Sequence, residues 1–234
     1  MPIGVICNAL AIAAGGAAGA ALGGRLSDSF KEKLTLVFGI CALGIGVSST
    51  VLMANLPAVV LSLILGTIVG SALRLGERIS RGGARLARLF PTKNEDGDSA
   101  LLVTTIVLFC ASGTGIYGSI VSGMSGDHSI LLAKSILDLF TAMIFACSLG
   151  MVVSVIALPQ LAIFLMLFLL ARVIYPLTTP AMISDFKAVG GLILLATGLR
   201  IARIRDFPIA DMIPAMLLVW PVSWIWTQWI APLM

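Results

Sequence analysis

Charged residues are scarce in this chain. They make up 11% of its 234 residues, whereas a soluble domain carries about 25%. Only one histidine is present, and the sequence contains no HExxH, GxSxG or nucleotide-binding loop. The four cysteines, Cys7, Cys41, Cys110 and Cys147, form no CxxC pair and have no close histidine partner. We therefore expect no enzyme activity, no catalytic residues, no metal and no cofactor.

Hydrophobic residues dominate what remains. They account for 59% of the chain, and the mean hydropathy is +1.09. These values predict an integral membrane protein, since a helix of about 20 apolar residues crosses the hydrocarbon core. Apolar blocks occupy residues 3–23, 33–53, 57–75, 101–122, 130–157, 159–177, 188–203 and 212–231. The predicted fold is an all-α polytopic membrane protein with about eight transmembrane helices in a single membrane domain, 1–234.

Two places leave the number of crossings open at seven or nine. The fifth and sixth blocks nearly fuse at Pro159, and Pro214 and Pro221 interrupt the last block. Helix starts are better marked: Ser29 to Glu32 has the spacing of a capping box, and Thr179-Pro180 offers a cap followed by proline.

Arginines recur every three or four residues between the third and fourth blocks. This pattern predicts a basic amphipathic helix and loop over 74–99 on the cytoplasmic side. The favoured partner is the lipid bilayer, with each arginine near anionic headgroups; calmodulin-like or nucleic-acid binding is the less favoured alternative, and no nucleic acid is expected. The predicted headgroup residues are Arg74, Arg78, Arg81, Arg85 and Arg88.

Lysine and arginine also predict orientation. Loops after the odd-numbered blocks hold twelve of these residues, whereas the opposite side holds only Arg172 and Lys187. By the positive-inside rule both termini lie outside the cytoplasm. An even number of crossings agrees with this orientation.

An internal repeat is suggested by two similar segments. Ser27-Asp28 precedes the second block and Ser184-Asp185 the seventh, and in each case a block beginning near a proline follows. The possible repeat units are 1–76 and 159–234. A displacement of five crossings would invert one unit relative to the other, as in many transporters, while chance resemblance between Gly- and Leu-rich helices is the rival explanation.

The densest polar segment is 118–138, on the side opposite the arginines. Lys134 and Asp138 have the i, i+4 spacing that places them on one helix face, which continues through Thr141. One interpretation is a structural pair in which Lys134 can reach the membrane interface by snorkelling. The alternative is a site that binds a transported ion or substrate. Asn8 needs a hydrogen-bond partner in lipid, whereas Asp185 and Asp211 are expected to cap the helices that they precede. The candidate pathway residues are Asn8, Gly118, Ser119, Asp127, His128, Lys134, Ser135, Asp138 and Thr141.

Glycines at four-residue spacing favour close helix packing over a pore. They are Gly15, Gly19 and Gly23 in the first block and Gly66 and Gly70 in the third. The packing is within the chain or between copies of it. A homo-oligomer is expected, with a dimer favoured, because a chain this small commonly dimerises if it forms a pathway.

Short motifs spread along the chain resemble a known family. They include Asn8 to Ile12, Gly15-Gly16, Gly118-Ser119, Gly126 to Ser129, Ala133 to Ser135, Leu137-Asp138, Phe145-Ala146, Gly190-Gly191, Gly198-Leu199 and Pro214-Ala215. This pattern is similar to domain of unknown function 554, the YqgA/YdfK-like bacterial membrane proteins. The resemblance spans essentially the whole chain and implies a polytopic inner-membrane protein with at most a suggested transport role. Leu139 departs from it, where a glycine is expected after the aspartate.

These observations lead to two functional hypotheses. The first is a transporter or channel for a small ion or solute, with a pathway lined by the fourth and fifth helices and Asp138 as the cation or proton ligand. The alternative is a membrane scaffold or sensor that transports nothing and acts through its glycine-rich faces and basic helix.

Overall fold

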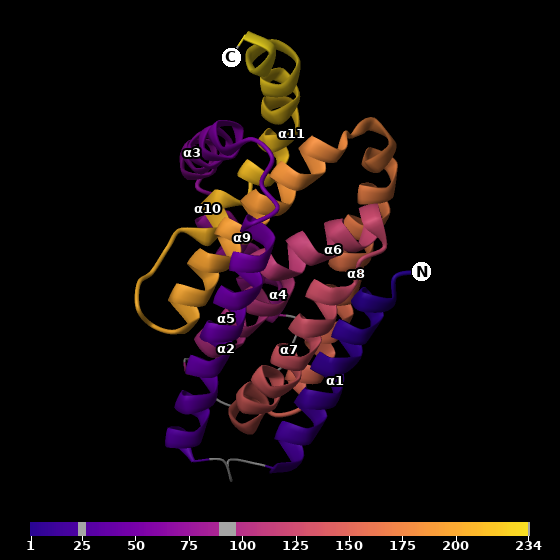
Figure 1. Ribbon diagram of the computed structural model, residues 1–234. Helices are drawn as coiled ribbons and strands as arrows, with labels where there is room; N and C mark the ends of the chain where they lie inside the picture. Colours follow the sequence, from indigo (N-terminus) through magenta and orange to yellow (C-terminus); the bar gives the residue numbers. More distant parts are fainter. Residues whose placement is uncertain (23–26, 89–96, 234) are drawn as a thin grey trace. The chain divides into compact units, whose positions relative to one another are not determined.

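The computed structural model describes residues 1–22, 27–88 and 97–233, and every regular element within these ranges is helical (Figure 1). The predicted all-α class is therefore confirmed. The helices are α1 (Ile3–Leu22), α2 (Asp28–Thr50), α3 (Leu56–Ala72), α4 (Leu75–Ala87), α5 (Gly97–Cys110), α6 (Gly113–Ser125), α7 (Ser129–Leu149), α8 (Val152–Ile174), α9 (Pro180–Ile201), α10 (Ile209–Met212) and α11 (Ala215–Ile225). A π-helical turn, Trp226–Ile230, continues α11.

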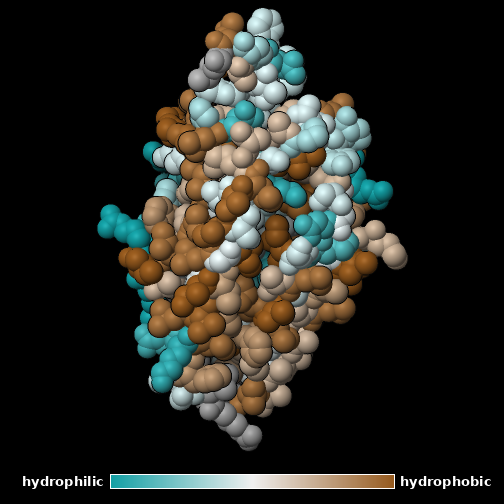
Figure 2. All heavy atoms as spheres, in the orientation of Figure 1, coloured by the Kyte–Doolittle hydropathy of each residue, from teal (hydrophilic) through white to brown (hydrophobic). Residues whose placement is uncertain are grey.

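The described helices have the length and surface of membrane spans. Seven described segments are long and apolar enough to cross, or eight if α3 and α4, which meet at 56°, form one bent span. Large hydrophobic side chains are exposed along them, including Ile40 and Leu158 at 66%. Figure 2 shows hydrophobic side chains over much of the visible face. Such a surface is stable in hydrocarbon, so this is a multi-pass membrane protein in contact with the bilayer.

Several predicted helix ends are wrong. The fifth and sixth blocks separate at Gly150, and Pro159 lies inside α8. Gly150 has φ +72° and ψ −153°, a conformation that is essentially restricted to glycine, so this residue breaks the helix. The fourth block consists of α5 and α6, which are separated at Ala111 and Ser112.

Two predicted caps had different outcomes. The Ser29 capping box is wrong because α2 begins at Asp28, and the Ser27 hydroxyl accepts from the Phe30 N–H instead. The Thr179 cap is confirmed: its hydroxyl accepts from the Met182 N–H, and α9 begins at Pro180 rather than at 188.

The chain folds as two compact units. Unit 1 comprises Met1–Thr35 and Glu77–Val173, and unit 2 comprises Leu36–Gly76 and Ile174–Met234. Each unit therefore combines an early and a late part of the sequence. The repeat units suggested for 1–76 and 159–234 stay predictions.

Unit 1 is held together by glycines that let helix backbones approach. A Cβ on Gly15 or Gly19 of α1 would overlap the carbonyl of Leu139 or Met143 on α7, and the rising numbers on both helices show that they run parallel. Gly16 lies against Ser154 of α8, whose hydroxyl donates to the Ala13 carbonyl at 2.9 Å. The predicted packing role is confirmed for Gly15 and Gly19, while Gly23 lies outside the described residues.

In unit 2 glycines also let helix backbones approach, here between antiparallel helices. Gly39 and Gly46 of α2 meet Ala202 and Leu195 at the end of α9. Gly66 of α3 packs on Ala215, and a Cβ on Gly70 would overlap the Asp211 carbonyl. These close contacts confirm packing for Gly66 and Gly70 and fix the core of unit 2.

Candidate functional site

Lys134 and Asp138 form an ion pair inside unit 1. They lie one turn apart on α7, and the Lys134 ammonium is 2.8 Å from Asp138 Oδ1 and 2.7 Å from Oδ2. Only 5% and 8% of the two side chains is exposed. The predicted pairing is therefore found, whereas snorkelling of Lys134 is not, because its ammonium lies against the carboxylate.

Two amides extend this pair to neighbouring helices. Asn8 of α1 donates its Nδ2 to Asp138 Oδ2 at 2.8 Å. Gln160 of α8 donates its Nε2 to Asn8 Oδ1, also at 2.8 Å. Both amides are fully buried. We call Asn8, Lys134, Asp138 and Gln160 the buried polar cluster; it joins α1, α7 and α8.

One acceptor of the cluster has no partner. Gln160 Oε1 is the only buried side-chain nitrogen or oxygen in the described part of the chain that makes no hydrogen bond. Turning the amide over would place two acceptors, Gln160 Oε1 and Asn8 Oδ1, against each other. An unsatisfied buried acceptor costs about 1–3 kcal/mol. The cluster thus retains one position suited to a hydrogen-bond donor or a cation.

The cluster lies deep within α7. Asp138 is nine residues after Ser129 in a helix of 21 residues, or roughly 14 Å along an axis of about 32 Å. A lone charge at such depth costs at least about 2.5 kcal/mol, but the pair is neutral as a whole. Charge compensation and three hydrogen-bonded helices explain how the ionisable groups are tolerated there.

Hydroxyl groups that were predicted to line a pathway donate hydrogen bonds to backbone carbonyls of their own helices. Ser119, Ser135 and Thr141 each donate to the carbonyl four residues earlier, at 2.7, 2.7 and 2.8 Å. Gly118 of α6 packs beside Leu131 of α7. No hydrogen bond recorded in the described structure joins these residues to the buried polar cluster.

Asp127 and His128 lie at the turn between α6 and α7. Gly126 has φ +72° and ends α6 in the left-handed conformation. His128 Nδ1 is 2.6 Å from the Ser122 hydroxyl. The Asp127 carboxylate is exposed and accepts from the N–H and hydroxyl of Ser129. These bonds form a polar cap at the turn between α6 and α7.

Sequence analysis missed a second buried carboxylate, in unit 2. Asp185 is fully buried, and its Oδ1 accepts the N–H groups of Ala54 and Asn55 at 2.9 and 2.7 Å. Its Oδ2 accepts the Asn55 side-chain amide at 2.9 Å and the Ser223 hydroxyl at 2.7 Å. Asp185 was predicted to cap its own helix; it caps α3 instead, because α9 begins five residues before it. The four bonds satisfy the carboxylate fully.

Asp211 acts in a similar way. It was also predicted as a helix cap, and its carboxylate accepts from the Gly76 N–H at 3.0 Å, at the start of α4. The predicted basic helix is confirmed as α4, where Gly83 and Ala87 are buried. Its arginines, Arg78, Arg81 and Arg85, and the flanking Arg74 and Arg88, are exposed. Of the loop predicted up to Ser99, residues 89–96 lie outside the described ranges and Gly97 already begins α5.

Comparisons with known proteins extend over nearly the whole chain. A family model described as a protein of unknown function (DUF554) matches residues 3–224. The chain is 50% identical over 235 residues to the uncharacterized protein YqgA of Escherichia coli (strain K12), covering 99% of this chain and 100% of that protein. It is 26% identical over 222 residues to the uncharacterized membrane protein YdfK of Bacillus subtilis (strain 168), covering 92% and 93%. No solved structure gives a significant match.

Proposed function

This chain belongs to the DUF554 family of proteins of unknown function, and we propose that it transports a small ion or solute across the bacterial inner membrane. The observation that carries the proposal is the buried polar cluster, with its unpartnered Gln160 Oε1. Intramembrane ionisable groups are expensive and are most often kept for substrate or ion handling. We propose no catalytic activity.

The cluster offers a way to couple binding to movement. Asn8 links Gln160 to Asp138, so a ligand that bonds to Gln160 Oε1 or to the carboxylate competes with contacts between α1, α7 and α8. The proposed pathway therefore follows α7, the fifth predicted crossing, and its central residue is Asp138. The fourth crossing, of which α6 is part, supports α7 by packing.

Burial in unit 2 supports the inverted repeat that this proposal includes. On α3 the buried residues include Ala58, Val59, Ser62 and Gly66; on α11 they are Ala215, Met216, Val219 and Ser223. Each of the second set follows its counterpart by 157 residues (from 58 to 215), the same spacing as from Asp28 to Asp185. The two helices run antiparallel. Repeats over 1–76 and 159–234 related by inversion account for both facts.

Flux measurements test the transport role. Purified protein in proteoliposomes is given gradients of H⁺, Na⁺, K⁺, chloride, phosphate and neutral amino acids in turn, and wild type is compared with Asp138→Asn and Gln160→Leu. We expect wild type to carry at least one of these solutes and both variants to lose most of that flux. Asp206→Asn is the matched control, because the Asp206 side chain is 92% exposed.

Two outcomes decide against the proposal. Equal flux through wild type and Asp138→Asn removes the role of Asp138. Absence of flux for every solute, with the protein folded, favours the alternative of a membrane scaffold or sensor that acts through α4 and its helix-packing faces. A homodimer with both termini outside the cytoplasm completes the proposed arrangement.

A further inference from the structure

A short basic turn follows α9 in unit 2. We call residues 200–206 the basic turn; its charged side chains are three arginines and one aspartate. A pocket of about 530 Å³ is lined by Arg200, Arg203, Ile204, Arg205 and Asp206. The turn connects two apolar segments that can cross the membrane, Pro180–Ile201 and Ile209–Leu233. It therefore emerges from the membrane beside the lipid headgroups.

The backbone of this turn is one that usually contains glycine. Arg203 N–H donates to the Arg200 carbonyl, and Ile204 N–H donates to the Leu199 carbonyl, which together form a Schellman motif. Arg203 occupies the left-handed position of that motif, with φ +57°. Glycine is the usual residue there because any side chain is strained. An arginine held in this position is a reason to look for a function of its guanidinium.

The end of α3 repeats this arrangement. Arg74, with φ +50°, is the other non-glycine residue of positive φ in the described ranges, and its N–H donates to the Ser71 carbonyl. Asp185 near the start of α9 contacts Asn55 at the start of α3, so the two helices have their beginnings together. Within unit 2 both left-handed arginines therefore follow helices that end on the same side.

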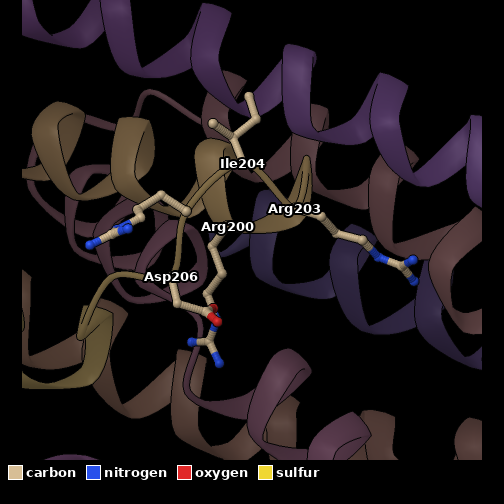
Figure 3. Close-up of a pocket in the computed structure, with 5 residues that line it drawn as sticks. Arg200, Arg203, Ile204 and Asp206 are labelled. Carbon is tan, nitrogen blue, oxygen red and sulfur yellow. The ribbon is translucent and has the colours of Figure 1, made fainter.

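The side chains of the basic turn diverge (Figure 3). Arg200 and Asp206 point toward one another, with Arg200 Nε 3.3 Å from Asp206 Oδ1, while Arg203 extends in another direction. Ile204 is 66% exposed. Arginines that point apart do not converge on one free anion; they fit a layer containing many phosphate groups. An exposed isoleucine between them fits the acyl chains beneath that layer.

We propose that the basic turn is a binding site for anionic phospholipids. Arg200, Arg203 and Arg205 contact lipid phosphates, and Ile204 inserts among the acyl chains. The Arg200–Asp206 ion pair is exposed, so it gives way readily to a phosphate. This inference is independent of the proposed transport role, since it concerns other residues in the other unit.

Lipid binding by the full-length protein tests the site. Protein in zwitterionic detergent is titrated with phosphatidylglycerol, with phosphatidylcholine or with sodium phosphate, and retained lipid is counted by native mass spectrometry while thermal unfolding is followed. We expect phosphatidylglycerol to bind and to raise the unfolding temperature, with little effect of the other two. Arg203→Gly suits the left-handed backbone but removes the guanidinium, and about a fivefold loss of phosphatidylglycerol affinity is expected.

Further variants separate site-specific binding from net charge. Arg203→Lys keeps the charge and is expected to retain most of the binding, whereas Ile204→Gln weakens it. Arg172→Gln, at the end of α8 in unit 1, removes one positive charge elsewhere and is expected to bind as wild type. Unchanged binding by Arg203→Gly, an equal loss in Arg172→Gln, or an equal rise in unfolding temperature with sodium phosphate each overturns the proposal. The unfolding temperature of each variant is compared with and without lipid, so a change in the variant's basal stability does not obscure the result.

Discussion

The carboxylate of Asp185 accepts hydrogen bonds from both the backbone N–H and the side-chain amide of Asn55, at 2.7 and 2.9 Å. These residues are 130 positions apart in sequence. The Asp185 carboxylate places a negative charge at the N-terminus of α3, where the helix dipole favours it. Asn55 itself makes no capping bond with its side chain. One residue thereby ties α9 to α3 and, through Ser223, to α11.

Loss of this carboxylate should destabilise unit 2. Asp185→Leu leaves two N–H groups, the Asn55 amide and the Ser223 hydroxyl without their acceptor, and we expect a loss of about 3 kcal/mol in unfolding free energy. Asp185→Asn should cost less, since one oxygen remains to accept. Thermal unfolding in a single detergent measures both changes. The comparison variant Asp206→Asn alters an exposed acid and should change stability by no more than about 0.5 kcal/mol. Equal stability of Asp185→Leu and wild type would contradict the capping role.

The Lys134–Asp138 pair should show strong coupling in a double-mutant cycle. Each single variant, Lys134→Met or Asp138→Leu, leaves one buried charge uncompensated, and a cost of about 3–5 kcal/mol is expected. The double variant removes both charges and should be much closer to wild type in stability. Additive losses would show that the two side chains do not compensate each other. Flux through the double variant should still be lost, which separates the proposed transport role from stability.

Close contact between α1 and α7 gives a third prediction. Gly19→Ala introduces a Cβ that overlaps the Met143 carbonyl, so the helices must separate, at a cost of about 1–3 kcal/mol. Gly44→Ala on α2 is the matched control: Gly44 is exposed with no atom within 4 Å of its Cβ position, and alanine there should be neutral or slightly stabilising. The yield of folded protein and its unfolding temperature measure both effects, and similar behaviour of the two variants would argue against tight packing.

Orientation can be tested with reporter fusions. The distribution of lysine and arginine predicts both termini outside the cytoplasm. Alkaline phosphatase fused after residue 234 should therefore be active, and green fluorescent protein at the same position should be dark. A fusion within the segment 89–96 should give the opposite pair of results. A fluorescent C-terminal fusion would require an odd number of crossings or an inverted orientation.

Local patterns in the sequence predicted much of unit 1. Long apolar blocks identify membrane helices because backbone groups in hydrocarbon must be satisfied within the helix. The i, i+4 spacing of Lys134 and Asp138 predicted their contact, which needs only one helical turn. The need of Asn8 for a partner was also evident, because its amide lies in an otherwise apolar block. Its partners could not be identified, since they lie 130 and 152 residues away.

Gln160 was missed for a local reason. Pro159 was interpreted as the junction between the fifth and sixth blocks, which placed the following glutamine at the end of a helix rather than in its interior. The actual break is at Gly150, where the backbone angles exclude other residues. Pro159 lies inside α8, which tolerates the loss of one backbone N–H donor there. A polar side chain within an apolar helix was the available signal. Asp185 was misplaced similarly, because the apolar block was taken to begin at 188 although the predicted Thr179-Pro180 cap places Asp185 inside the helix.

The position of Asn8 has a consequence for how the protein is made. Its amide leaves the ribosome about 130 residues before Asp138 and 152 residues before Gln160. Throughout that interval α1 must remain in the translocon or lipid with an amide that has neither of its final neighbours, so its insertion is provisional until α7 and α8 arrive. Nascent chains halted before residue 138 should therefore release α1 from the bilayer more readily than chains halted after residue 160, and an Asn8→Leu substitution should abolish the difference.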